Sequence, residues 1–129
     1  MLGEQHDFEA GECFLAYIYY DDKSGGKARP VVLLRDEEDD TFLACKVTSQ
    51  GGNRLNKKYG YIIKDWEEVG LEKPSIIKCN TSDMRKIDEV AFYKKIGDLT
   101  SRDVKGFLVK QLKIRQMERR KERSNEYER

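Results

Sequence analysis

The stretch KARPVVLL, residues 27–34, places an apolar run directly behind two cations and a proline. The valine and leucine run predicts a buried strand over residues 29–35. Proline fixes its own φ and restricts the residue before it to extended geometry, so Arg29 is presented from a stiff backbone. We therefore expect a core strand that opens on a rigid cation at its rim.

The segments on either side of this strand have the same character. Each is apolar or alternating, and each is separated from it by a loop of glycine, serine or acidic residues. These strands and loops are ECFLAYIYY (12–20), DDKSGGK (21–27), DEEDD (36–40) and TFLACKVTS (41–49). Three strands joined by polar turns predict an antiparallel meander.

The middle of the chain continues with short elements. We expect a loop, three strands and one helical turn that Gly70 and Pro74 stop, while residues 80–90 are ambiguous between turn and strand. The expected elements are the loop SQGGNRLNKK (49–58), the strands YGYIIK (59–64), SIIKC (75–79) and AFYKKIG (91–97), and the helical turn within DWEEVGLEKPS (65–75).

From Thr100 the apolar period changes to that of a helix. Thr100 can cap the helix, with Asp103 at its third position. An apolar stripe then predicts that the helix packs on the sheet: Val104, Phe107, Leu108 and Leu112. After Ile114 the only aliphatic residue is Met117, so we expect a charged tail that frays.

Length and composition indicate one small domain of a mainly β protein. The chain has 129 residues, of which 38% are charged, and its formal net charge of +1 gives it no overall attraction for DNA or another polyanion. We expect a polar leader over 1–10, a domain over 11–114 and a charged helical or frayed tail over 115–129. Any nucleic-acid contact must therefore come from a local patch.

The cysteines and the leader point to the cytoplasm. The three cysteines form no CxxC pair and only one histidine is present, so neither a zinc site nor another metal or cofactor is expected. Cys13 and Cys45 lie in apolar strands, as small hydrophobes do in a reducing compartment. The leader lacks the apolar region of a signal peptide, and no run is long enough to span a membrane.

Six short motifs follow one another along the chain: GECFLAYIYY, K-x-RPVVLL, KVTS, GLEKPSIIKC, MRKID and KKIG. None is specific alone, but in this order they resemble the PemK/MazF family of toxin endoribonucleases. The resemblance extends from about Gly11 to Leu112. The loop YDDKSGGKARP is shorter than in many members, and CNTSD is longer than usual.

The resemblance implies a small SH3-like β-barrel with a C-terminal helix and a short internal helical turn. It implies a homodimer that cleaves single-stranded RNA, such as mRNA, without a metal and is neutralised by an acidic antitoxin. Its catalytic arginine is in the Arg-Pro step, here Arg29, and its catalytic hydroxyl is in the Thr-Ser step, here Thr48. The alternative is a noncatalytic module on the same barrel, either a degenerate toxin that binds RNA or a protein that poisons a partner such as a topoisomerase.

Metal-free cleavage needs attack by the ribose 2′-hydroxyl on the adjacent phosphorus. A guanidinium suits the phosphate charge because its planar fork can hold two oxygens. The general base stays open between the only histidine, His6, a carboxylate at Asp21 or Asp22, and a second function of Arg29.

RNA contacts are expected from loop cations and amides. Tyr59 or Tyr61 is available to stack on an unpaired base. The remaining candidates are Lys27, Ser49, Asn53, Arg54, Lys57, Lys58, Asn80 and Arg85.

Overall fold

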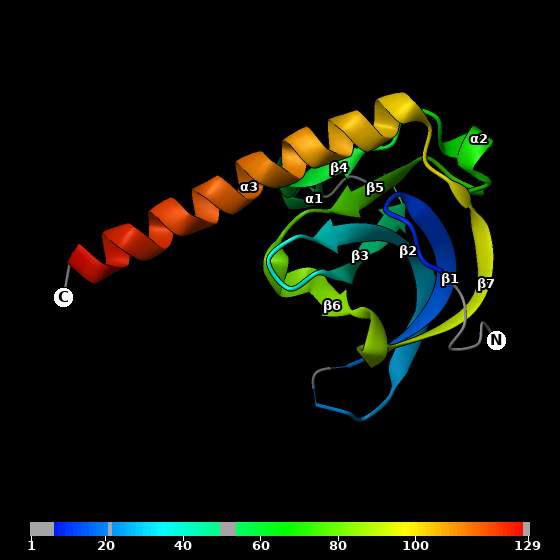
Figure 1. The fold of residues 1–129 in the computed structure, drawn as a ribbon, viewed down its shortest axis with the longest axis horizontal. Helices are drawn as coiled ribbons and strands as arrows, with labels where there is room; N and C mark the ends of the chain where they lie inside the picture. The colour runs from blue at the N-terminus through cyan, green and yellow to red at the C-terminus, as the bar shows by residue number, and fades with distance from the viewer. Residues whose placement is uncertain (1–6, 21, 50–53, 128–129) are drawn as a thin grey trace.

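The protein is a curved antiparallel sheet with a long C-terminal helix lying across it (Figure 1), in a computed structural model that describes residues 7–20, 22–49 and 54–127. The strand order is β4-β5-β3-β2-β1-β7, and β6 pairs with β3. The strands are β1 Glu12–Tyr19, β2 Gly26–Asp36, β3 Thr41–Ser49, β4 Gly60–Ile62, β5 Ser75–Lys78, β6 Met84–Lys86 and β7 Val90–Asp98. The fold is therefore mainly β, as predicted, and within the described residues the path of paired strands is open, with β4 and β7 at its two ends.

The helical elements are mostly short. They are the α-helices α1 Arg54–Tyr59, α2 Trp66–Val69 and α3 Ser101–Tyr127, and the 3-10 turns η1 Thr81–Asp83 and η2 Ile87–Glu89. The helical turn expected between residues 65 and 75 is confirmed as α2, which ends at Gly70 in the left-handed conformation. The ambiguous segment 80–90 is η1, β6 and η2 in succession.

The predicted meander is confirmed, but β2 is longer than expected. It starts at Gly26 and pairs with β1 before it meets β3, so Arg29 and Pro30 lie within the strand and not at its start. The β2–β3 ladder begins at Val31. Pro30, which has no N–H to donate, is tolerated because it lies beyond the end of that ladder.

Both faces of the sheet are buried. Val32 and Leu34 of β2 pack in one cluster with Phe107 of α3, whereas Val31 and Leu33 pack in the other. Three aromatic rings close the second cluster: Phe8, Phe14 and Phe92, with centroids 5.1–5.6 Å apart. Burial on both faces explains why the β2 run is continuously apolar.

One predicted loop is in part a helix. Residues 49–58 were expected to be a loop, but α1 begins at Arg54. Its sequence RLNKKY contains good helix formers, and its two lysines lie in the last turn, where cations favour the helix dipole. The helix ends where Gly60 passes close to β5, since a Cβ there would lie 2.4 Å from the Ile76 side chain.

The buried face of α3 differs from the predicted stripe. Phe107 and Ile114 are buried, as is Gln111, but Leu108 and Leu112 are 43% and 55% exposed. The prediction followed apolar residues alone, whereas the helix turns its face of Asp103, Phe107, Gln111 and Ile114 to the sheet. The helix does pack on the sheet as expected.

The tail continues α3 as a helix to Tyr127, which is the helical one of the two alternatives expected for residues 115–129. Met117 packs against the core, and the Glu118 carboxylate accepts hydrogen bonds from the backbone and side chain of Thr81 at 3.1 and 2.7 Å. Lys121 lies over the ring of Tyr59, and Arg119 is 3.6 Å from Glu38. Polar contacts to the body extend the helix where apolar burial ends.

The cysteines behave as predicted. All three are free and buried, and burial raises the pKa of the Cys13 and Cys79 thiols to about 12. Within the described residues, no helix has the length and apolarity that a membrane crossing requires.

Candidate nucleic-acid interface

Lys46 of β3 lies where three other strands approach one point. On one edge it pairs with Val31 of β2. On the other edge, β6 pairs with β3 as far as Cys45 and β5 pairs with it from Val47, so Lys46 lies between these two strands. The residue therefore lies at the point where the sheet divides.

Three more cations surround Lys46. Arg29 precedes Val31 by two residues on β2, and Arg85 pairs with Ala44 on β6, so strand alternation puts both on the face of Lys46. The β3–β5 register, continued by one pair, places Lys78 opposite Lys46. We call this set the cation cluster: Arg29, Lys46, Lys78 and Arg85.

The cation cluster places three further positive charges near the half-buried amine of Lys46. Burial lowers the pKa of Lys46, and Arg85 lowers it further. Arg29 and Lys78 act in the same direction, and Asp83 opposes them. Asp83 also lies 3.8 Å from Lys78, so the same carboxylate acts on two members of the cluster. An anionic ligand would relieve this repulsion.

The two predicted catalytic residues lie on this face. Arg29 and Thr48 each lie two residues beyond the Val31–Lys46 pair, where β3 leaves β2 and turns to pair with β5. Strand alternation gives both the same face as Lys46. The expectation that they approach one rim agrees with this register.

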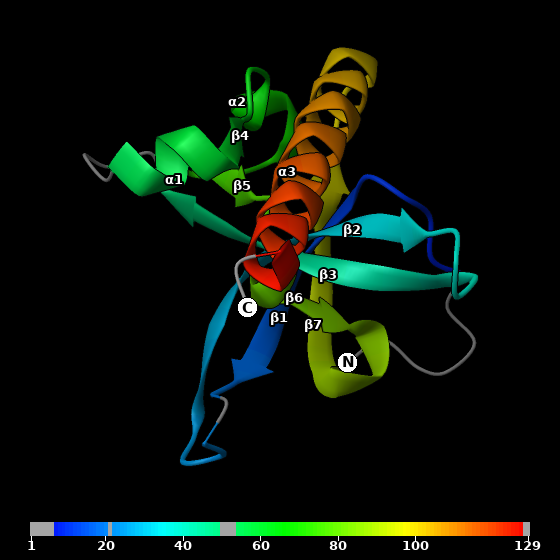
Figure 2. The ribbon, with the colours of Figure 1, turned by 90° about the vertical axis from the view of Figure 1, so that its left-hand side faces the viewer.

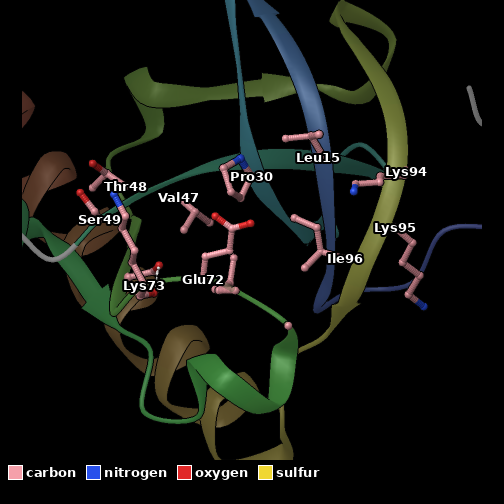
Figure 3. Close-up of a pocket in the computed structure, with 13 residues that line it drawn as sticks. Leu15, Pro30, Val47, Thr48, Ser49, Glu72, Lys73, Lys94, Lys95 and Ile96 are labelled. Carbon is pink, nitrogen blue, oxygen red and sulfur yellow. Dashed lines mark hydrogen bonds between the residues drawn. The ribbon is translucent and has the colours of Figure 1, made fainter.

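A cavity of about 480 Å³ opens on the opposite face of the sheet (Figure 3). Pro30 and Ile96 are among its apolar lining, and Glu72 points into it. Thr48 lies at its rim, on the side away from Ile96, while Arg29 is not among the lining residues. Of the predicted catalytic pair, Arg29 therefore lies in the cation cluster, whereas Thr48 lies between the cluster and this cavity.

The other predicted RNA contacts fall into two groups. Lys27 is exposed two residues before Arg29 on the same face of β2, and Arg85 belongs to the cluster itself. On the far side of the cluster, a groove of about 350 Å³ between α1 and η1 is lined by Asn56, Lys78 and Asn80.

The remaining predicted RNA contacts lie outside the cation cluster. Ser49 is exposed where β3 ends, and Arg54, Lys57 and Lys58 are exposed on α1. The structure thus brings Asn80 to the groove beside the cluster and leaves the α1 cations at the surface next to it. Asn53 lies outside the described residues.

The two tyrosines expected to stack on a base are engaged in the protein. Lys58 and Lys121 lie over the Tyr59 ring, at 5.2 and 5.8 Å from its centroid. The Tyr61 hydroxyl donates to Asp103 at 2.6 Å, and burial is the largest of the effects that raise its pKa. Both tyrosines therefore make contacts within the protein that the sequence did not reveal, and their stacking on a base stays a prediction.

Among the candidates for the general base, the structure describes the surroundings of Asp22. Asp22 accepts hydrogen bonds from the backbone and hydroxyl of Ser24, at 3.0 and 2.7 Å, and these bonds lower its pKa and weaken it as a base. His6 and Asp21 lie outside the described residues.

Sequence reasoning missed Lys46 and Lys78 as site residues. The available signal was a charged residue inside the otherwise apolar segments ACKV and SIIK. A lysine in a buried strand is uncommon because burying its charge is costly. The position of Lys46 beside the other cations follows only from the pairing of β3 with β5 and β6.

Comparison with known proteins adds no assignment. A scan against protein-family models finds no match, and a search of curated proteins finds no significant relative. Within residues 7–20, 22–49 and 54–127, no three or more His, Cys, Asp or Glu side chains gather as they would to hold a metal ion.

Proposed function

We propose that the protein is a toxin-type endoribonuclease that binds single-stranded RNA at the cation cluster and cleaves it at a phosphate beside Arg29. The convergence of four cations where the sheet divides carries this proposal. The resemblance of the six motifs to PemK/MazF toxins supports it. The curved antiparallel sheet with its terminal helix gives the mainly β class expected from the resemblance, although its path of paired strands is open within the described residues.

The cluster supplies what the reaction needs electrostatically. The 2′-hydroxyl loses its proton to a base as its oxygen forms a bond to phosphorus. The bond from phosphorus to the 5′-oxygen breaks, and that oxygen takes up a proton, so the products are a 2′,3′-cyclic phosphate and a 5′-hydroxyl. Negative charge grows on the phosphate oxygens during this step. Arg29 holds these oxygens, Lys46 and Arg85 add positive charge, and Thr48 donates a hydrogen bond.

The groove and strand β2 extend the site in both directions. Lys27 and Arg29 lie two residues apart on one strand face, about 7 Å, so each can contact a different phosphate. Asn80 and Lys78 offer contacts on the other side of the cluster. We further propose, from the resemblance alone, a cytoplasmic homodimer that an acidic antitoxin covers at this surface.

Cleavage of long, varied RNA transcripts in the presence of EDTA tests the proposal. We expect cuts that leave cyclic phosphate and 5′-hydroxyl ends. Arg29→Ala should lower the rate at least about 100-fold, the scale of losing one charge-stabilising group. Thr48→Val should lower it about 10-fold because it removes one donor.

Arg35→Ala is the matched control. Arg35 lies on the same strand but pairs with Asp40 at the exposed turn, so its loss should leave cleavage unchanged. If no transcript is cut, or if Arg29→Ala and Arg35→Ala cleave at equal rates, the proposal is wrong. RNA binding without cleavage would favour the noncatalytic module.

A further inference from the structure

A second large cavity adjoins the cation cluster. It encloses about 780 Å³ between the end of β1 and the start of β7, which pair through Ile18 and Val90. In Figure 1 the turn that joins β6 to β7 lies beside these strands. The polar and aromatic residues that line it are Tyr19, Tyr20, Lys23, Arg85, Asp88 and Glu89.

Two tyrosines give the cavity aromatic surface. Tyr19 and Tyr20 are 54% and 52% exposed, although apolar rings usually seek burial. Tyr17 packs edge-on against Tyr19 with centroids 5.1 Å apart. The backbone of Tyr20 is fixed by hydrogen bonds to Gly25 at 2.7 Å and from Lys23 at 2.9 Å. Exposed aromatic rings carried by a fixed backbone, as here, are suited to stack on a nucleobase.

Arg85 links this cavity to the phosphate site. Its Nη1 donates to the carbonyls of Ser82 and Met84 at 2.9 and 3.0 Å, which fixes the guanidinium. The same side chain lines the cavity and acts on Lys46. A base in the cavity would therefore belong to a nucleotide close to the phosphate at the cluster.

Two carboxylates in the cavity lining bear on which nucleobase the cavity can bind. Asp88 and Glu89 are exposed in η2, and neither makes an ion pair or side-chain hydrogen bond with another described residue. A carboxylate accepts two parallel hydrogen bonds and donates none. Guanine, through N1–H and N2–H, presents two adjacent donors on its Watson–Crick edge. The other three RNA bases present at most one donor beside an acceptor.

We propose that this cavity binds a guanine of single-stranded RNA, with its ring against Tyr19 or Tyr20 and its Watson–Crick edge on Asp88 or Glu89. The inference rests on the proposed function, because the cluster supplies the phosphate contact. It makes the cavity the specificity site and places guanine near the cleaved bond.

Fluorescence anisotropy with 2′-fluoro pentanucleotides tests this inference without cleavage, because these lack the nucleophile. The wild-type protein is titrated with UUGUU and with the same sequence carrying inosine or adenine at the centre. Inosine lacks the N2 amino group and so loses one of the two hydrogen bonds. We expect UUGUU to bind about tenfold more tightly than either, the scale of one bidentate contact.

Substitutions of the lining residues test which side chains produce the preference for guanine. Asp88→Asn or Glu89→Gln should remove the preference for guanine, and Tyr20→Ala should weaken all three ligands. Asp39→Asn, at the exposed β2–β3 turn, is the control and should change nothing. Equal affinity for the three ligands would overturn the inference even if transcripts are cleaved. A guanine preference without cleavage would uphold it and count against the proposed catalysis.

Discussion

Two charged regions of the protein are built on opposite principles. At the start of α3 the buried Asp103 accepts hydrogen bonds from the Tyr61 hydroxyl and from the backbone of Lys64 and Asp65, at 2.6, 2.9 and 2.8 Å. Nearby, Asp65 is paired with Arg102. In the cation cluster, Lys46 is half buried near Arg29, Lys78 and Arg85, which lower its pKa, while Asp83 raises it.

The difference separates a structural role from a functional one. A buried charge whose hydrogen bonds are satisfied holds elements together, here the β4–α2 connection and the first turn of α3 (Figure 2). A half-buried charge near like charges destabilises the fold, and such groups cluster at functional sites, the role proposed for the cation cluster. Removing charge should therefore have opposite consequences in the two regions.

The largest expected effect is a loss of folding stability on substitution of Asp103. Asp103→Asn replaces one acceptor oxygen with a donor group that faces a backbone N–H, so we expect it to lower the free energy of unfolding by about 2–4 kcal/mol. Urea denaturation followed by circular dichroism measures this. Glu67→Gln on the exposed side of α2 is the control, and equal stability of the two variants would show that the Asp103 network is dispensable.

A smaller effect is expected in the pH dependence of cleavage. Because the pKa of Lys46 is lowered, its charge is lost at a lower pH than that of an ordinary lysine, and activity should fall on the alkaline side. Lys46→Arg keeps the cation at every accessible pH. The alkaline limb of the rate profile should move to higher pH in this variant, and identical limbs would exclude Lys46 as its source.

The smallest effect concerns acid stability at Asp65. Hydrogen bonds from Arg102 and Thr100 lower its pKa from 3.8 to about 2. This pairing therefore stabilises the folded protein above pH 3.8, and the contribution is lost as pH falls toward 2. Arg102→Gln should lower Tm slightly at neutral pH, with no difference near pH 2. A difference that persists at low pH would assign the effect to packing.

The sequence predicted the strands of the meander, α2 and the packing of α3 because apolar period and turn residues are local signals. It did not predict the exposure of Leu108 and Leu112, since several helix faces carried apolar residues and the buried Gln111 was not considered for the core. The choice between a helical and a frayed tail was left open because the tail's contacts to Thr81 and Tyr59 are polar and distant in sequence.

The candidate site was predicted only in part, because some of its residues carry local signals and others come together only in the fold. Arg29 and Thr48 were found through motifs, and Arg85 as a loop cation. The central position of Lys46 depends on three strands that meet only in the folded sheet. The engagement of Tyr59 and Tyr61 likewise follows from α3 packing and has no local signal.

The most direct test of the cation cluster is Lys46→Met, with thermal unfolding and RNA binding measured on the same preparation. Methionine keeps much of the aliphatic stem and removes the charge. We predict a higher Tm, because repulsion with Arg29 and Arg85 is relieved, and RNA affinity reduced about tenfold at low salt. A lower Tm with unchanged RNA affinity would contradict the assignment of this cluster as the phosphate site.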